Sequence, residues 1–186
     1  MALTQQATWE KIKFNEKQLL IKRLGELVDS KRYDNDILKD KLEKTVNLHS
    51  IQQTLNIYPA KKKNHIFAYL IEHTYPNGYN GNIRLLTAVD AKNQLLGVRV
   101  VAHKETPGLG DKIETRKSNW IKQFKGLSFL NLDKNQWKVK KDGGVFDAFT
   151  GATITPRAIV TATSDVLTLL SKTCLINQTG KTCSVR

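Results

Sequence analysis

The 186-residue sequence predicts an α+β fold, in which an antiparallel sheet packs against helices. Segments rich in β-branched and aromatic residues occupy residues 66–73, 83–89 and 95–102. The last two segments are joined by residues 90–94, as in a hairpin. An amphipathic helical pattern precedes the strands at residues 15–28, and another follows them after Thr155. The chain length suits one domain with a sizeable core.

Residues 1–63 are predicted to form an N-terminal helical arm, and residues 64–186 the main domain. Apolar residues recur at helical spacing within residues 15–28, namely Leu19, Leu20, Leu24, Leu27 and Val28. A polar stretch at residues 30–35 ends this helix. A second short helix is expected at residues 36–46, and the chain up to Lys63 is expected to be helical or irregular.

The C-terminal elements are expected to alternate with loops. Residues 75–81 and 103–113 are read as loops, residues 118–124 as a short helix capped by Ser118, and residues 137–140 as a short strand. The last helix has a hydroxyl cap at Thr155 and a proline at its first position, Pro156. It is expected to end near Cys174.

The formal net charge of +13 suits a polyanion partner. The basic residues are dispersed, however, and Lys61, Lys62 and Lys63 form the single tight run. Trp9, Trp120 and Trp137 are scattered rather than interleaved with a basic face. We therefore expect no nucleic-acid partner and favour a solvated lysine-rich surface, with a basic polyanion-binding module as an alternative.

Other site classes find little support. The sequence has no HExxH, no GxSxG and no CxxC pair, so no metal site is predicted. Cys174 and Cys183 are spaced for a small disulfide loop, and two free thiols fit equally well. No run of about 18 apolar residues and no signal-peptide pattern occurs.

The segment before the last helix, DGGVFDAFTGATIT, carries the features of a phosphate site. A helix N-terminus presents unpaired N–H groups and the positive end of its dipole, which favour an anion. Gly151 and Ala152 keep the approach open, and Thr150, Thr153 and Thr155 add three hydroxyls. The plain alternative is a helix cap rich in threonine.

A second candidate segment is the loop KETPGLGD, at residues 104–111. Pro107, Gly108 and Gly110 favour a tight turn whose backbone can approach a flat ligand. Leu109 offers an apolar contact, and the Thr106 hydroxyl can bond a polar edge. The loop matches neither a P-loop nor the GxGxxG fingerprint, and an ordinary connection is its alternative.

Together these segments resemble a known family. TGAT at residues 150–153 resembles the [ST]GAT motif at which FMN is esterified to threonine in flavin-binding subunits of bacterial ion-pumping redox complexes. GYNG at residues 78–81 and HKETPGLGDKIE at residues 103–114 are similar to the G subunit of the Rnf (Rsx) electron-transport complex. The C subunit of the sodium-pumping NADH:quinone reductase is a sister family. The resemblance covers roughly residues 64–172.

The resemblance implies an FMN-binding domain that works as an electron-transfer subunit, without catalysis of its own. It implies that Thr153 holds FMN through a phosphoester made from FAD by a separate flavin transferase. It places Thr150, Gly151, Ala152 and Thr155 at the phosphate. It places along the isoalloxazine ring Glu105, Thr106, Pro107, Gly108, Leu109 and Gly110.

The resemblance also implies partners and a location. The partners are the other subunits of an Rnf-type complex in the bacterial inner membrane, with this domain on the periplasmic side. Family members begin with a membrane anchor, and we expect that such an anchor has been removed from this sequence. A flavin domain of another redox enzyme is the nearer alternative function.

Overall fold

The computed structural model describes the backbone of residues 2–172 and the side chains of residues 14, 15 and 17–172. Five strands form one antiparallel sheet in chain order. They are β1 (Leu42–Leu48), β2 (Ile51–Lys62), β3 (His65–Gly78), β4 (Gly81–Asp90) and β5 (Leu95–Ala102). Two α-helices, α1 (Ala2–Leu27) and α2 (Ile154–Lys172), flank the sheet. The predicted α+β class with an N-terminal helix is therefore confirmed, whereas Cys174 and Cys183 lie outside the described residues.

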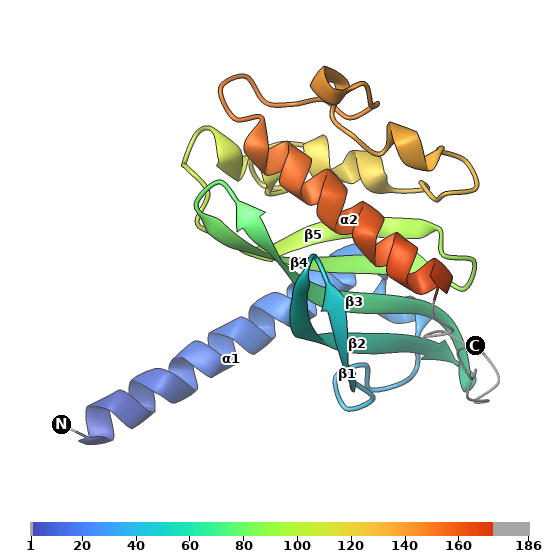
Figure 1. The fold of residues 1–186 in the computed structure, drawn as a ribbon. Helices are drawn as coiled ribbons and strands as arrows, with labels where there is room; N and C mark the ends of the chain where they lie inside the picture. Colours follow the sequence, from blue (N-terminus) through green and yellow to red (C-terminus); the bar gives the residue numbers. More distant parts are fainter. Residues whose placement is uncertain (1, 173–186) are drawn as a thin grey trace.

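The sheet is covered on both faces (Figure 1). Successive side chains of a strand therefore point alternately into two hydrophobic cores. On β3, Tyr69 and Ile71 pack into the core shared with α2, while Ala68 and Leu70 face the core shared with the end of α1. This period of two follows from the pleat of a strand. The N-terminal half of α1 projects away from the sheet in Figure 1. The sheet and α2 thus form the frame that holds the loops after β5.

The secondary structure expected between residues 36 and 63 is wrong. This stretch forms β1 and β2 instead of a short helix and irregular chain. Two-residue turns with positive φ reverse the chain at His49-Ser50 and again at Lys63-Asn64. Such turns match the twist of hairpin strands, and glycine or asparagine usually signals them. The division of the chain at residue 63 remains a prediction, and it falls inside the hairpin of β2 and β3.

Four smaller expectations also need correction. Residues 75–81 are mostly the end of β3. Trp120–Phe124 is a 3-10 helix with Asn119 at the cap position, and the Ser118 hydroxyl oxygen accepts the Trp120 N–H at 3.1 Å, as expected of a capping side chain. In place of the strand at residues 137–140, Val139 makes an isolated bridge to Phe146. Helix α2 begins at Ile154, one residue earlier than its expected cap at Thr155.

An aromatic cluster fixes the long segment between β5 and α2. The rings of Phe124 and Phe146 stack with centroids 4.9 Å apart, and Trp137 lies 5.4 Å from Phe146. Gly144 allows the chain to fold back closely, since a Cβ there would lie 2.0 Å from the Lys138 carbonyl oxygen. Aromatic packing of this kind gives the segment a defined position beside the start of α2.

A chain of hydrogen bonds crosses the core on the α2 side of the sheet. Asp165 Oδ2 lies 2.9 Å from His49 Nδ1, His49 Nε2 lies 3.3 Å from His73 Nδ1, and His73 Nε2 lies 3.0 Å from Thr87 Oγ1. With Asp165 ionised and both rings neutral, each histidine donates from Nδ1 and accepts at Nε2, and Thr87 donates. Burial lowers the pKa of His73 to about 3. These two histidines therefore form hydrogen bonds within the core.

Among residues 2–172, no helix has the length and apolarity needed to cross a membrane. Among the residues whose side chains are described, no three histidine, cysteine, aspartate or glutamate side chains are arranged to hold a metal ion.

Candidate functional site

A hollow of about 220 Å³ opens where three segments meet at the N-terminal end of α2. The β3–β4 turn, the loop after β5 and the chain entering α2 each contribute to its wall. Its lining residues are Tyr79, Thr106, Leu109, Gly110, Gly151, Ala152, Thr153, Ile154 and Thr155. The hollow therefore joins the three segments that the motifs had singled out.

Thr153 stands directly before α2, at the position of the helix cap. Its carbonyl accepts the N–H of Arg157 at 3.3 Å, as the first bond of the helix. The preceding turn is closed by the Ala152 N–H, which donates to the Phe149 carbonyl at 3.1 Å. Gly151 occupies this turn with a φ of 79°, a value that side-chain-bearing residues rarely adopt. The turn delivers the Thr153 hydroxyl to the positive end of the α2 dipole.

The side chain of Lys141 places a positive charge beside the same hydroxyl. Its Nζ lies 3.4 Å from Thr153 Oγ1. The neighbouring Asp142 accepts two hydrogen bonds from Arg157 in the first turn of α2, at 2.6 and 2.9 Å. These guanidinium hydrogen bonds lower the pKa of the Asp142 carboxyl. The bidentate pair ties the turn carrying Lys141 to the helix that carries the hollow.

Glu105 is buried behind the hollow and joins its three walls. Its Oε1 accepts the Asn80 N–H at 3.0 Å, and its Oε2 accepts the Tyr79 N–H at 3.2 Å. Oε2 also accepts a short hydrogen bond from the Thr155 hydroxyl on α2. Gly110 makes room for this carboxylate, since a Cβ there would lie 2.8 Å from Thr155 Oγ1 and 2.9 Å from Glu105 Cβ. Glu105 therefore acts on the site through other residues.

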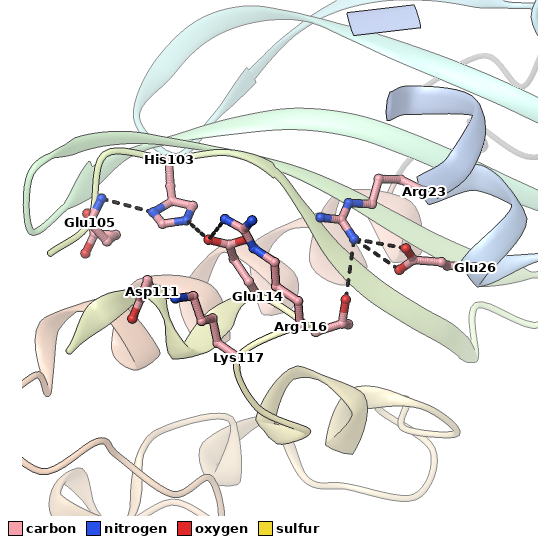
Figure 2. A network of polar contacts seen from close by, with 9 residues as sticks. Arg23, Glu26, His103, Glu105, Asp111, Glu114, Arg116 and Lys117 are labelled. Atoms are coloured by element: carbon pink, nitrogen blue, oxygen red, sulfur yellow. Dashed lines mark hydrogen bonds and ion pairs between the residues drawn. The ribbon is translucent and has the colours of Figure 1, made fainter. Parts of the chain in front are cut away.

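His103 anchors the same loop from its other side (Figure 2). Its Nδ1 accepts the Glu105 N–H at 3.0 Å, and its Nε2 lies 3.1 Å from Glu114 Oε1. A ring that accepts at Nδ1 carries its proton at Nε2, so it donates to Glu114. Hydrogen bonds from Arg116, at 2.5 Å and 3.1 Å, are the largest cause of the lowered pKa of the Glu114 carboxyl. Both ends of the loop are thus tied into charged networks.

The rim of the hollow is apolar and exposed. Tyr79, Leu109 and Ile154 keep 63%, 41% and 44% of their surface accessible, and all three line the hollow. Grouped exposure of this kind marks a binding surface more often than isolated exposed side chains do. A flat aromatic ligand would cover these groups, and an anionic end would meet Lys141 and the start of α2. The residues present fit a flavin mononucleotide in both respects.

The structure brings together most of the residues predicted for the site. Seven of them line the hollow, namely Thr106, Leu109, Gly110, Gly151, Ala152, Thr153 and Thr155. Of the other four, Glu105 is buried, and the exposed Pro107, Gly108 and Thr150 shape the turns beside the lining residues. The sequence reasoning missed Tyr79, Ile154 and Lys141. Tyr79 lies inside the quoted GYNG motif, whereas nothing in the sequence distinguishes Lys141 from its lysine neighbours.

This fold and this hollow define a flavin-binding domain, and comparison with known families agrees. A family model described as FMN-binding domain matches residues 78–168. The match begins at the end of β3 and runs through most of α2, so it includes all three segments around the hollow.

Relatives carry a more specific description, as the G subunit of an ion-translocating oxidoreductase complex. One of them, from Shewanella amazonensis, is 45% identical over 172 residues, which are 92% of this chain and 80% of the relative. Another, from Haemophilus influenzae (strain PittEE), is 46% identical over 83% of this chain and 74% of its own length. A third, from Vibrio parahaemolyticus, is 39% identical over 92% and 82% respectively. The chain belongs to this family of G subunits.

Proposed function

We propose that this protein is an electron-transfer subunit of a membrane-bound, ion-translocating oxidoreductase complex, and that it carries FMN bound covalently through a phosphoester to Thr153. The observation that carries the proposal is the convergence of three segments on one hollow, which Thr153 lines. Membership in the G-subunit family supports the complex, and the matching FMN-binding domain supports the cofactor.

The proposed attachment follows from the chemistry of the hollow. The phosphate of FMN would join Thr153 Oγ1, beside the Lys141 ammonium at 3.4 Å. The first N–H groups of a helix have no partner within it, which leaves those of α2 for the phosphate oxygens. We assign Thr150, Gly151 and Ala152 to the turn that presents Thr153.

The remaining lining residues form the proposed binding site for the flavin ring. Leu109 and Tyr79 would contact the ring faces, and Thr106 and Gly110 would meet its polar edge. Glu105, together with Pro107 and Gly108, would hold the loop in the required shape. The bound flavin supplies the redox chemistry, while these residues fix its position and its access to water.

The proposal extends to partners and location. A flavin transferase would load the cofactor from FAD, which requires that Thr153 be reachable in the unloaded protein. The other subunits of the complex would supply and accept the electrons. The domain would lie on the periplasmic side of a bacterial inner membrane, anchored by a segment that precedes the described residues.

The test is coexpression of the chain with a flavin transferase, followed by denaturation and intact-mass measurement. Wild type should gain the mass of one FMN minus one water and keep its visible absorbance after denaturation. Thr153→Ala should gain neither, and Thr153→Ser should regain the adduct because it restores a hydroxyl. Peptide mapping should place the adduct on Thr153 rather than on Thr150 or Thr155.

A protein known to be flavinylated serves as the control in the same cells. If that control is labelled while wild type stays bare, the covalent part of the proposal is wrong. An adduct that survives in Thr153→Ala would move the attachment to another residue.

A further inference from the structure

We propose that Lys141 is the cation that this chain supplies for the phosphoryl group at Thr153, during attachment and afterwards. The inference rests on the proposed function of Thr153. It starts from the distance of 3.4 Å between Lys141 Nζ and Thr153 Oγ1. An atom bonded to that oxygen would come within direct reach of the ammonium.

The position of Lys141 is imposed by its surroundings. It lies in a 3-10 turn, Lys140–Asp142, which ends at Gly143 with a φ of 82°. The bidentate pair between Asp142 and Arg157 fastens this turn to the first turn of α2. Pairs of this geometry are directional as well as attractive, so they orient the residues beside them. The clamp therefore holds Lys141 over the start of α2.

The neighbouring lysine has a different role. Lys140 Nζ lies 2.7 Å from Asp147 Oδ1, and both side chains are more than half exposed. Lys140 and Lys141 thus lie in the same turn, carry the same charge and are both exposed, but Lys141 contacts the Thr153 hydroxyl whereas Lys140 pairs with Asp147. Lys140 therefore provides a matched control for the effect of a positive charge beside Thr153.

The attachment step defines what the cation does. Thr153 Oγ1 attacks the phosphorus of FAD that bears the riboflavin, the bond from this phosphorus to the oxygen of AMP breaks, and AMP leaves. The hydroxyl proton passes to a base of the transferase. Negative charge gathers on the phosphoryl oxygens during the step, and one negative charge remains on the phosphodiester. A cation beside Oγ1 stabilises both the transition state and the product.

The experiment measures the initial rate of flavinylation of the purified chain with a purified flavin transferase and FAD. Samples are quenched over time, and the labelled fraction is read by intact mass. We expect Lys141→Gln to slow labelling about fivefold, a size between that of an exposed ion pair and a charge-assisted hydrogen bond. Lys140→Gln should label like wild type, and Lys141→Arg should recover most of the rate.

Two further readouts separate charge from folding. The thermal unfolding midpoint of unlabelled Lys141→Gln should match that of Lys140→Gln, because both side chains are exposed. Added salt should slow wild type more than Lys141→Gln, since screening acts on the charge that the variant lacks.

Equal labelling rates for Lys141→Gln and Lys140→Gln would overturn the role of Lys141 while leaving covalent attachment intact. A wild type that is never labelled, beside a labelled control protein, would overturn the attachment and this inference together.

Discussion

Replacing Glu105 by glutamine tests whether one buried carboxylate joins the three walls of the hollow. The side chain keeps its shape but loses its charge, and one acceptor oxygen becomes a donor NH₂ group. With its oxygen toward Tyr79 and Thr155, the amide turns its NH₂ against the Asn80 N–H. In the reverse orientation, the NH₂ meets the Tyr79 N–H instead. Either way, one partly buried backbone donor loses its acceptor.

The magnitude follows from these contacts. A donor that is shielded from water and left without an acceptor costs about 1–3 kcal/mol. The other two hydrogen bonds lose their charge assistance, which removes about half of their strength and adds about 1 kcal/mol. Glu105→Gln should therefore lower the free energy of unfolding by about 2–4 kcal/mol. For a chain of this length the unfolding midpoint should fall by roughly 8 °C. Glu105→Ala should cost more, because it leaves all three donors unpaired.

Urea unfolding followed by tryptophan fluorescence measures the change, since Trp137 is buried in the core. Glu43→Gln is the control, because Glu43 lies exposed on β1 and pairs with Lys41 at the surface. Its loss should cost less than about 0.5 kcal/mol. If Glu105→Gln unfolds within about 0.5 kcal/mol of wild type, the carboxylate does not hold the three segments together, and the reasoning fails.

Two further predictions concern the frame of the site. Gly144→Ala should destabilise the chain by about 3 kcal/mol or more in urea unfolding, because its Cβ would lie 2.0 Å from a backbone carbonyl; a loss under about 1 kcal/mol would contradict this. Since the folded pKa of His73 is about 3, below its unfolded value of about 6.5, the unfolded chain binds more protons between these limits. Stability should therefore fall as pH drops from about 6.5 to 3, by at most about 1.4 kcal/mol per pH unit from this group, and His73→Asn should flatten that slope in pH-dependent melts.

The sequence predicted the fold class and the last three strands of the sheet because β3, β4 and β5 are buried on both faces. Such strands are rich in β-branched and aromatic residues, so their composition predicts a strand without knowledge of the strands that they pair with. Strand β1 was missed because most of its residues are exposed at the edge of the sheet. Leu42 and Val46 stand four residues apart there, and this spacing imitates a helix.

The turns at the two ends of β2 were also missed, because their residues do not have the composition typical of hairpin turns. His49-Ser50 and Lys63-Asn64 adopt positive φ without glycine. Their conformation is set by the strands that they connect, so composition alone did not reveal a hairpin. The pairing of β2 with β3 across residue 63 is likewise a long-range outcome.

At the site, local features of the sequence indicated the expected chemistry, whereas the packing of the elements sets which groups meet. Gly151 and the helix start at residues 150–156 are local features, so Thr153 could be named from its neighbours in the chain. Glu105 was predicted beside the ring, but the fold buries it among backbone donors of the β3–β4 turn. Lys141 reaches Thr153 because Asp142 and Arg157 pair across fifteen residues. Contacts of that kind depend on how elements pack, and no pattern of adjacent residues records them.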